Sequence, residues 1–170
     1  GEQGVVDVVA KDKTRMLSLA AALERESEHP IAKAIFQYAR GQNVPEIHTT
    51  DFSALSGRGV RATINGKSVY IGGPRILEER AVRLDATLRA ATKKASDDGK
   101  TVVYVIEGRN VLGAIMLADV IRKESREAVA TLHSMGKRVA MLTGDSKGVA
   151  AWVAKELGIK EYFAEVLPEN

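Results

Sequence analysis

The chain has 170 residues, 45% of them hydrophobic and 28% charged, a composition typical of a globular protein and not of a disordered chain. The formal net charge is only +3, and because the charges are interleaved instead of forming a basic stripe, we expect no nucleic-acid partner. The absence of cysteine excludes disulfide bonds and thiolate metal sites, and three scattered histidines give no reason to expect a metal site.

The first 41 residues predict a strand and two helices. The apolar run Val5–Ala10 indicates a strand, and Thr14 is a plausible N-cap for a helix that ends near Glu28. Pro30 suits the first position of a second helix, since its missing N–H would have no partner there. Gly41 is expected to end that helix.

Residues 60–71 carry the clearest local signal, with residues alternating on both sides of Asn65-Gly66. This dipeptide favours a two-residue type I′ turn, which fixes the register of a hairpin so that Gly59 faces Gly72. The same register places three pairs on one face: Ile64 with Lys67, Ala62 with Val69, and Val60 with Ile71. Two facing glycines would leave a patch without side chains, which a planar base could approach closely.

The rest of the chain predicts two kinds of sheet. The spacing from Leu77 to Ala95 predicts one long amphipathic helix, followed by strands at Thr101–Ile106 and Val111–Leu117. After Asp119, helices and strands alternate, as in a parallel sheet. We therefore predict an α/β protein in which an antiparallel sheet with helices on one side is joined to a partial parallel α/β domain. The expected domains are 1–114 and 115–170.

One candidate binding cluster lies at the break between the first two helices. Glu24 is followed there by Ser27, Glu28, His29 and Pro30. An imidazole and two carboxylates could stack against and hydrogen-bond a flat polar ring. The alternative interpretation is that His29 only caps the second helix.

The second cluster is the glycine segment around the predicted hairpin. It contains Gly57, Gly59 and Val60, with Gly72 and Gly73 at the other end of the hairpin. A lone Gly-x-Gly usually marks only a turn or bulge. The facing glycines of the predicted register are what favour a binding surface here.

Two further clusters lie later in the chain. Thr143, Gly144 and Asp145 follow a predicted buried strand and precede a helix, a position where α/β proteins bind phosphate groups. An ordinary turn with an aspartate cap is the alternative. Asp119 and Arg122 form either a functional hinge pair or a surface contact of little energetic weight.

Taken together, these motifs occur in one characteristic order. They are SEHP at 27–30, GRGV at 57–60, IGG at 71–73, DVIR at 119–122, TGD at 143–145 and VLPE at 166–169. This order resembles the large cytoplasmic loop of heavy-metal-transporting P-type ATPases, most closely the copper and silver pumps. The similarity covers nearly the whole chain.

The resemblance implies a nucleotide-binding domain joined to part of a phosphorylation domain with a haloacid-dehalogenase-like fold. Glu24 and His29 resemble the pair that recognises adenine, and the nucleotide would lie against Gly57 and Gly59. Many members of the family have Asn where this chain has Gly73. A polar contact expected near the nucleotide is therefore missing.

For the later part of the chain, the resemblance implies contact with phosphate and magnesium. Thr143 and Asp145 resemble the loop that meets these groups, and Asp119 resembles an aspartate near the interdomain hinge. The family's DKTGT segment, whose aspartate is phosphorylated, is absent, as is its GDGxND segment. We therefore expect the chain to hold no catalytic residue, and to bind nucleotide without turning it over.

The implied function is that of the ATP-binding domain of a copper- or silver-type exporting pump. Its cofactors would be ATP and Mg²⁺, and its partners ATP or ADP and the pump's actuator and transmembrane parts. The chain would be a cytoplasmic domain of an integral cell-membrane protein. A haloacid-dehalogenase-like phosphatase with a cap domain and a non-catalytic interaction module are the alternatives.

Overall fold

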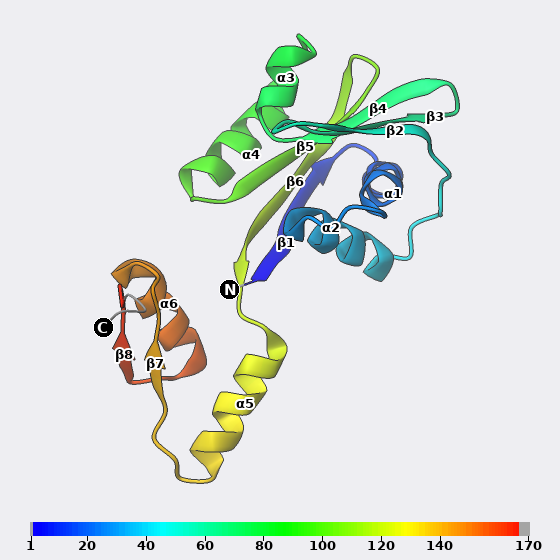
Figure 1. Cartoon of the computed structure of the whole chain (residues 1–170). Coiled ribbons are helices and arrows are strands. Elements are labelled where there is room, and N and C mark those ends of the chain that lie inside the picture. Colours follow the sequence, from blue (N-terminus) through cyan, green and yellow to red (C-terminus); the bar gives the residue numbers. More distant parts are fainter. Residues whose placement is uncertain (1, 167–170) are drawn as a thin grey trace. The chain divides into compact units, whose positions relative to one another are not determined.

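The computed structural model describes residues 2–166, and the chain divides into two compact units, Gln3–Asp119 and a second that contains Glu2 and the residues from Val120 onward (Figure 1). The boundary expected after residue 114 falls inside a strand, β6 (Asn110–Val120). This strand does not end there because Ala114–Leu117 are all buried in the sheet of the first unit.

The first unit is built on a six-stranded sheet with the order β1-β6-β5-β4-β3-β2. Its other strands are β1 (Glu2–Ala10), β2 (Thr50–Leu55), β3 (Gly59–Ile64), β4 (Lys67–Gly72) and β5 (Thr101–Glu107). Each neighbouring pair from β2 to β6 is antiparallel, which confirms the predicted antiparallel sheet. The edge strand β2 was not predicted, since it is almost entirely exposed and lacks a regular apolar alternation.

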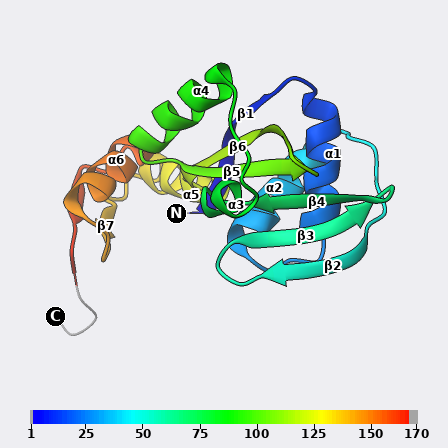
Figure 2. The ribbon, with the colours of Figure 1, turned by 90° about the horizontal axis from the view of Figure 1, so that it is seen from above.

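Helices cover both faces of this sheet, whereas the sequence predicted helices on one side only. The pair α1 (Lys13–Glu24) and α2 (Pro30–Gly41) packs on one face, and α3 (Arg75–Glu79) with α4 (Ala86–Asp97) packs on the other (Figures 1 and 2). The central strand β5 explains the difference. Val103 and Val105 face the first helix pair while Val102 and Tyr104 face the second, so both sides of the strand need an apolar cover.

The predicted hairpin between β3 and β4 is confirmed in its turn and its register. Asn65 and Gly66 have φ values of 50° and 76°, as a type I′ turn requires. Gly59 pairs with Gly72, and the three pairs between them and the turn also match the prediction.

The single long helix predicted from Leu77 to Ala95 is wrong, because the chain breaks between α3 and α4. Ala81 adopts φ 49°, and Asp85 starts α4 by accepting a hydrogen bond from the backbone N–H of Leu88 at 2.8 Å. From the loop between α3 and α4, Val82 and Leu84 pack into the apolar cluster that these two helices form with the sheet. The helical spacing therefore continued across a segment that is not helical.

The second unit has the predicted alternation of helices and parallel strands. It contains α5 (Lys123–Ser134), β7 (Ala140–Leu142), α6 (Lys147–Leu157) and β8 (Glu161–Phe163), and β7 and β8 pair in parallel. Residues 167–169 of the VLPE motif lie outside the described residues.

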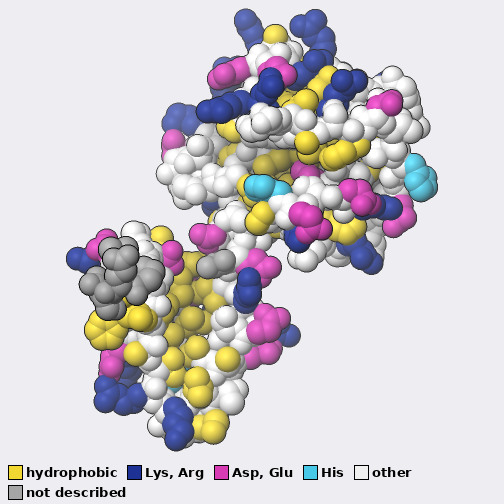
Figure 3. Space-filling view, viewed as in Figure 1, with side chains coloured by type: hydrophobic (Ala, Val, Ile, Leu, Met, Phe, Trp, Pro, Cys, Tyr) yellow, Lys and Arg dark blue, Asp and Glu magenta, His cyan; other side chains and the backbone are white. Residues whose placement is uncertain are grey.

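Apolar side chains gather on the surface of this second unit (Figure 3). Its buried core consists of Val129, Ala154 and Ile159. Large apolar residues lie exposed around it: Leu132, Met135, Leu142, Val149, Trp152, Tyr162 and Phe163. A two-stranded sheet buries too little apolar surface to cover them. No helix among residues 2–166 is long and apolar enough to cross a membrane.

Candidate functional site

A cavity of about 460 Å³ in the first unit gathers most of the expected binding residues. Its walls come from the end of α1, the break before α2, the turn between β2 and β3, and the adjoining ends of β3 and β4. The expected residues that line it are Glu24, Ser27, His29, Gly57, Gly59, Val60, Gly72 and Gly73. Its volume lies within the range of small-molecule sites, about 300–1,000 Å³.

Glu24 is the buried acidic group of this cavity. It is the last residue of α1, and only 8% of its surface is exposed. Burial raises the pKa of its carboxyl to about 7, because desolvation penalises the charged form. Among the described residues, no side chain forms an ion pair or a hydrogen bond with this carboxyl.

His29 caps α2, as the alternative interpretation of the sequence proposed. Its Nδ1 accepts a hydrogen bond from the backbone N–H of Ile31 at 3.3 Å. Because Nδ1 is the acceptor, the neutral ring carries its proton on Nε2. His29 also lines the cavity, so capping and ligand contact do not exclude each other.

The structure separates Glu28 and Pro30 from the other expected residues, since neither lines the cavity. The Glu28 carboxylate pairs with Lys33, and this hydrogen bond and charge lower the pKa of Glu28. Pro30 is the first residue of α2. Its contribution is to start the helix that carries His29 at its cap.

The glycines of the cavity fall into two structural classes. A Cβ on Gly59 would lie 2.0 Å from the backbone oxygen of Ile71 in β4, and a Cβ on Gly72 would lie 2.0 Å from the backbone oxygen of Arg58 just before β3, so this close approach requires glycine at both positions. A Cβ on Gly57 or Gly73 would meet no atom within 4 Å. These two glycines border open space.

Sequence reasoning assigned no role to several residues that line the cavity, including some that lie within the GRGV and IGG motifs. Arg58 lines the cavity from the turn between β2 and β3 and forms an ion pair with Glu79 at 2.9 Å. The further lining residues are Ile31, Ala32, Ala54, Leu55, Ser56, Ile71 and Val103. The position of Arg58 between two glycines was the signal that could have found it. The apolar lining residues could not be distinguished from ordinary core residues in the sequence.

Thr143, Gly144 and Asp145 form a tight loop at the carboxyl end of β7, as predicted. The Thr143 hydroxyl donates to the Asp145 carboxylate at 2.9 Å and accepts from the Asp145 backbone N–H at 3.1 Å. Asp145 is not the helix cap: α6 has Ser146 at that position. The aspartate cap of the alternative interpretation is therefore wrong.

Asp119 and Arg122 both contact residues at the start of β1. Gln3 donates to the Asp119 carboxylate from its Nε2 at 2.7 Å, and Arg122 pairs with Glu2 at 3.0 Å. The chain passes from one unit to the other at these two places. Asp119 and Arg122 thus lie where a hinge would have to bend.

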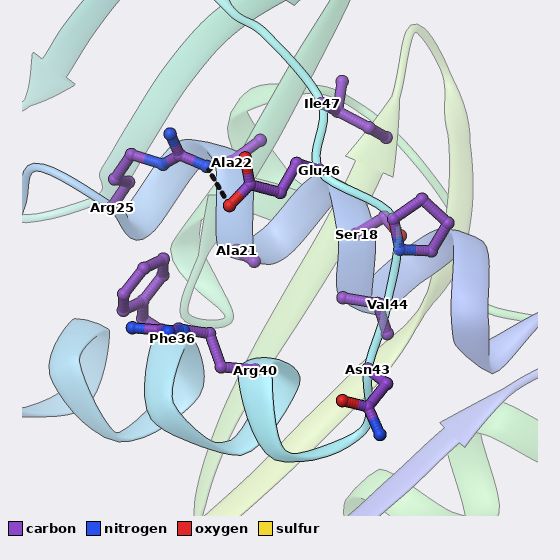
Figure 4. A pocket seen from close by; sticks show the side chains of 11 residues that line it. Ser18, Ala21, Ala22, Arg25, Phe36, Arg40, Asn43, Val44, Glu46 and Ile47 are labelled. Atoms are coloured by element: carbon purple, nitrogen blue, oxygen red, sulfur yellow. Dashed lines mark ion pairs between the residues drawn. The ribbon is translucent and has the colours of Figure 1, made fainter.

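A second cavity, of about 330 Å³, lies between α1, α2 and the loop that follows them (Figure 4). Arg25 forms an ion pair with Glu46 across it at 3.4 Å, and the Arg40 guanidinium lies 6.0 Å from the ring centre of Phe36. Two arginines and one carboxylate line this cavity, and it shares no lining residue with the first cavity. It therefore serves as a reference surface when ligand binding to the first cavity is measured.

The described residues contain no cluster of three or more side chains suited to bind a metal ion. The candidate sites are the cavity of about 460 Å³ in the first unit, with the buried Glu24 carboxyl, and, separately, the Thr143–Asp145 loop of the second unit. A model of the haloacid dehalogenase-like hydrolases matches residues 1–169.

The chain belongs to this family. It is also 41% identical to the copper-exporting P-type ATPase B of Archaeoglobus fulgidus over all of its own length, which is 24% of that relative. The resemblance to heavy-metal P-type ATPases is confirmed. The chain thus spans about a quarter of the length of this relative.

Two solved structures illustrate the shared fold. A zinc-transporting PIB-type ATPase in its E2P state matches with a TM-score of 0.74 and 30% identity over 99% of this chain and 27% of the other. The catalytic domain of the CPx-ATPase CopB-B, described with nucleotide binding, matches with a TM-score of 0.54 and 27% identity over 99% of this chain and 57% of the other.

Proposed function

We propose that the unit Gln3–Asp119 is the ATP-binding domain of a copper- or silver-type exporting P-type ATPase, and that ATP binds in the 460 Å³ cavity. The observation that carries the proposal is that one cavity holds both His29 and the buried carboxyl of Glu24, which has no ion-pair partner among the described residues. A neutral imidazole offers a donor and a stacking face to a flat base. The CopB-B domain, named for its nucleotide binding, supports the proposal.

The residues of this chain would hold and orient ATP, without forming a covalent bond to it. Phosphoryl transfer depends chiefly on positioning and on neutralising charge. Base recognition by Glu24 and His29 would fix one end of the nucleotide, which leaves the triphosphate free to reach an acceptor aspartate in the rest of the pump.

Magnesium would act at the second unit. The Thr143–Asp145 loop supplies one carboxylate and one hydroxyl, and Mg²⁺ is commonly held by one or two carboxylates together with phosphate oxygens. These residues fit a partial site that the phosphates of ATP and further parts of the pump would complete. The ion, when bound, would neutralise charge on the transferred phosphoryl group.

The hinge and the pump's membrane context are part of the same proposal. Asp119 and Arg122 would guide the motion that brings the nucleotide to the phosphorylation domain. The exposed apolar residues of the second unit, such as Leu142 and Phe163, would be covered by further strands of a longer protein. The chain would then be a cytoplasmic part of a membrane pump with actuator and transmembrane parts.

The pump is favoured over a free-standing phosphatase and over an interaction module because of the relative that matches along the whole chain. A titration with ATP followed by amide NMR tests the proposal. We expect the signals of Glu24, His29, Gly57 and Gly59 to shift, and those of Arg40 and Asn43 in the second cavity to stay in place. Shifts confined to the second cavity would refute the proposal.

A further inference from the structure

Among the described residues, no ion pair or side-chain hydrogen bond neutralises the buried Glu24 carboxyl. The ionisable side chains that share its cavity are His29, at the start of α2, and Arg58, in the turn between β2 and β3. Arg58 is paired with Glu79 at 2.9 Å, and the Nδ1 of His29 is engaged in the helix cap. The remaining lining is uncharged: it includes apolar residues such as Ala32 of α2 and Val103 of β5, and the hydroxyl residues Ser27 and Ser56.

A buried carboxyl in such surroundings keeps its proton to unusually high pH. The pKa of Glu24 is raised to about 7 by desolvation, so both the neutral and the ionised form are populated in neutral solution. A bound ligand stabilises either the neutral or the ionised form of the Glu24 carboxyl. Which form it stabilises depends on the hydrogen-bond donors and acceptors of the base.

Adenine presents a hydrogen-bond acceptor next to a donor, since its exocyclic amino group is flanked by ring nitrogens without a proton. A neutral carboxyl matches this edge, because it has one O–H donor and one carbonyl acceptor. An ionised carboxylate only accepts, and one of its oxygens would face a ring nitrogen lone pair. The edge of guanine with adjacent N–H donors suits the ionised form instead.

We propose that Glu24 recognises adenine as a neutral carboxylic acid, with its O–H donating to a ring nitrogen and its carbonyl oxygen accepting from the amino group. The inference rests on the proposed function and adds the protonation state of this residue. Binding of ATP then takes up a proton. Adenine nucleotides lose affinity relative to guanine nucleotides as the pH rises.

Calorimetric titration of the full chain with ATP and with GTP at pH 6, 7 and 8 tests this inference. For a group that binds only when neutral, apparent affinity follows the neutral fraction, so ATP affinity should fall about tenfold from pH 6 to pH 8. Titration at pH 7 in two buffers with different ionisation enthalpies should show uptake of about half a proton. The ratio of ATP affinity to GTP affinity should fall over the same range.

The variant Glu24→Gln separates the two protonation states. Glutamine has a fixed donor and a fixed acceptor, and it pairs with adenine as a neutral carboxyl would. We expect its ATP affinity to lose the pH dependence that comes from residue 24. Glu28→Gln is the matched control, since it removes an acidic group of the same segment that lies outside the cavity, and it should keep the wild-type pH profile.

Opposite results would overturn the inference without touching the proposed function. They are wild-type affinity that increases with pH, proton release on binding, or a loss of more than about tenfold in Glu24→Gln at pH 7. If that variant fails to fold, the proton count on the wild type still decides. Failure of ATP to bind at every pH would overturn the proposed function, and the inference with it.

Discussion

Gly59 and Gly72 face each other across β3 and β4, and the space beside each is filled by a backbone oxygen, that of Ile71 beside Gly59 and that of Arg58 beside Gly72. A methyl group at either position would lie 2.0 Å from that oxygen, so the strands would have to separate. The GRGV and IGG motifs thus include glycines that the sheet itself demands. A nucleotide is not required to explain them.

The first prediction follows from this contact. Gly59→Ala and Gly72→Ala should each lower the free energy of unfolding by about 3 kcal/mol or more, because the clash is with backbone and cannot be relieved by a rotamer change. Gly73→Ala, whose Cβ meets open space, should change it by less than about 0.5 kcal/mol. Urea unfolding followed by far-UV circular dichroism measures the difference. Equal stability of Gly59→Ala and Gly73→Ala would show that the strands can separate at little cost.

A second prediction distinguishes the two roles of His29. His29→Asn should keep the cap of α2, since an asparagine oxygen also accepts from the Ile31 N–H, but it removes the imidazole from the cavity. We expect unchanged stability and ATP binding weaker by about 1–2 kcal/mol, the scale of one lost hydrogen bond with its stacking contact.

His29→Ala is the comparison, because it removes both the ring and the cap. It should show the same loss of ATP affinity and a stability loss of about 1 kcal/mol. Calorimetry with ATP and urea unfolding measure the two effects separately. ATP affinity that is unchanged in both variants would remove His29 from the binding site.

Features of the fold that are set by a few neighbouring residues were predicted from the sequence, whereas features set by tertiary contacts were not. The Asn65-Gly66 turn sets its own geometry, so the hairpin register and the Gly59–Gly72 pair followed from sequence alone. The break at Ala81 did not, because loop residues Val82 and Leu84 continue the apolar spacing of a helix. The motif residues led to the walls at the break before α2 and at the ends of β3 and β4, whereas Val103 reaches the cavity from β5 only through the tertiary fold.

The third prediction concerns pH and stability. In the folded chain Glu24 has a pKa raised from 4.5 to about 7, so between these values the folded state holds a proton that the unfolded state has lost. Stability of the first unit therefore falls as pH rises from 4.5 to 7 and levels off above it. A shift of this size corresponds to about 3 kcal/mol as an upper bound.

Comparison of the wild type with Glu24→Gln isolates this contribution. The variant should be more stable than the wild type at pH 8 and nearly equal to it at pH 4.5. Far-UV circular dichroism follows the sheet of the first unit, and fluorescence of Trp152, the single tryptophan of the chain, follows the second unit separately. An identical pH dependence of unfolding in both proteins would contradict the burial effect.

The last prediction concerns Gly73, which borders the cavity but is not required by the backbone. Its φ lies outside the left-handed range, and an added Cβ meets nothing within 4 Å, so Gly73→Asn should fold with wild-type stability. An asparagine amide at this position would supply the polar contact toward a bound nucleotide that the family resemblance leads us to expect. We expect ATP affinity to increase by about 1 kcal/mol, the net value of one hydrogen bond, while Gly73→Ala leaves it unchanged. Calorimetry on the three proteins tests this, and equal ATP affinities would mean that the nucleotide lies out of reach of residue 73.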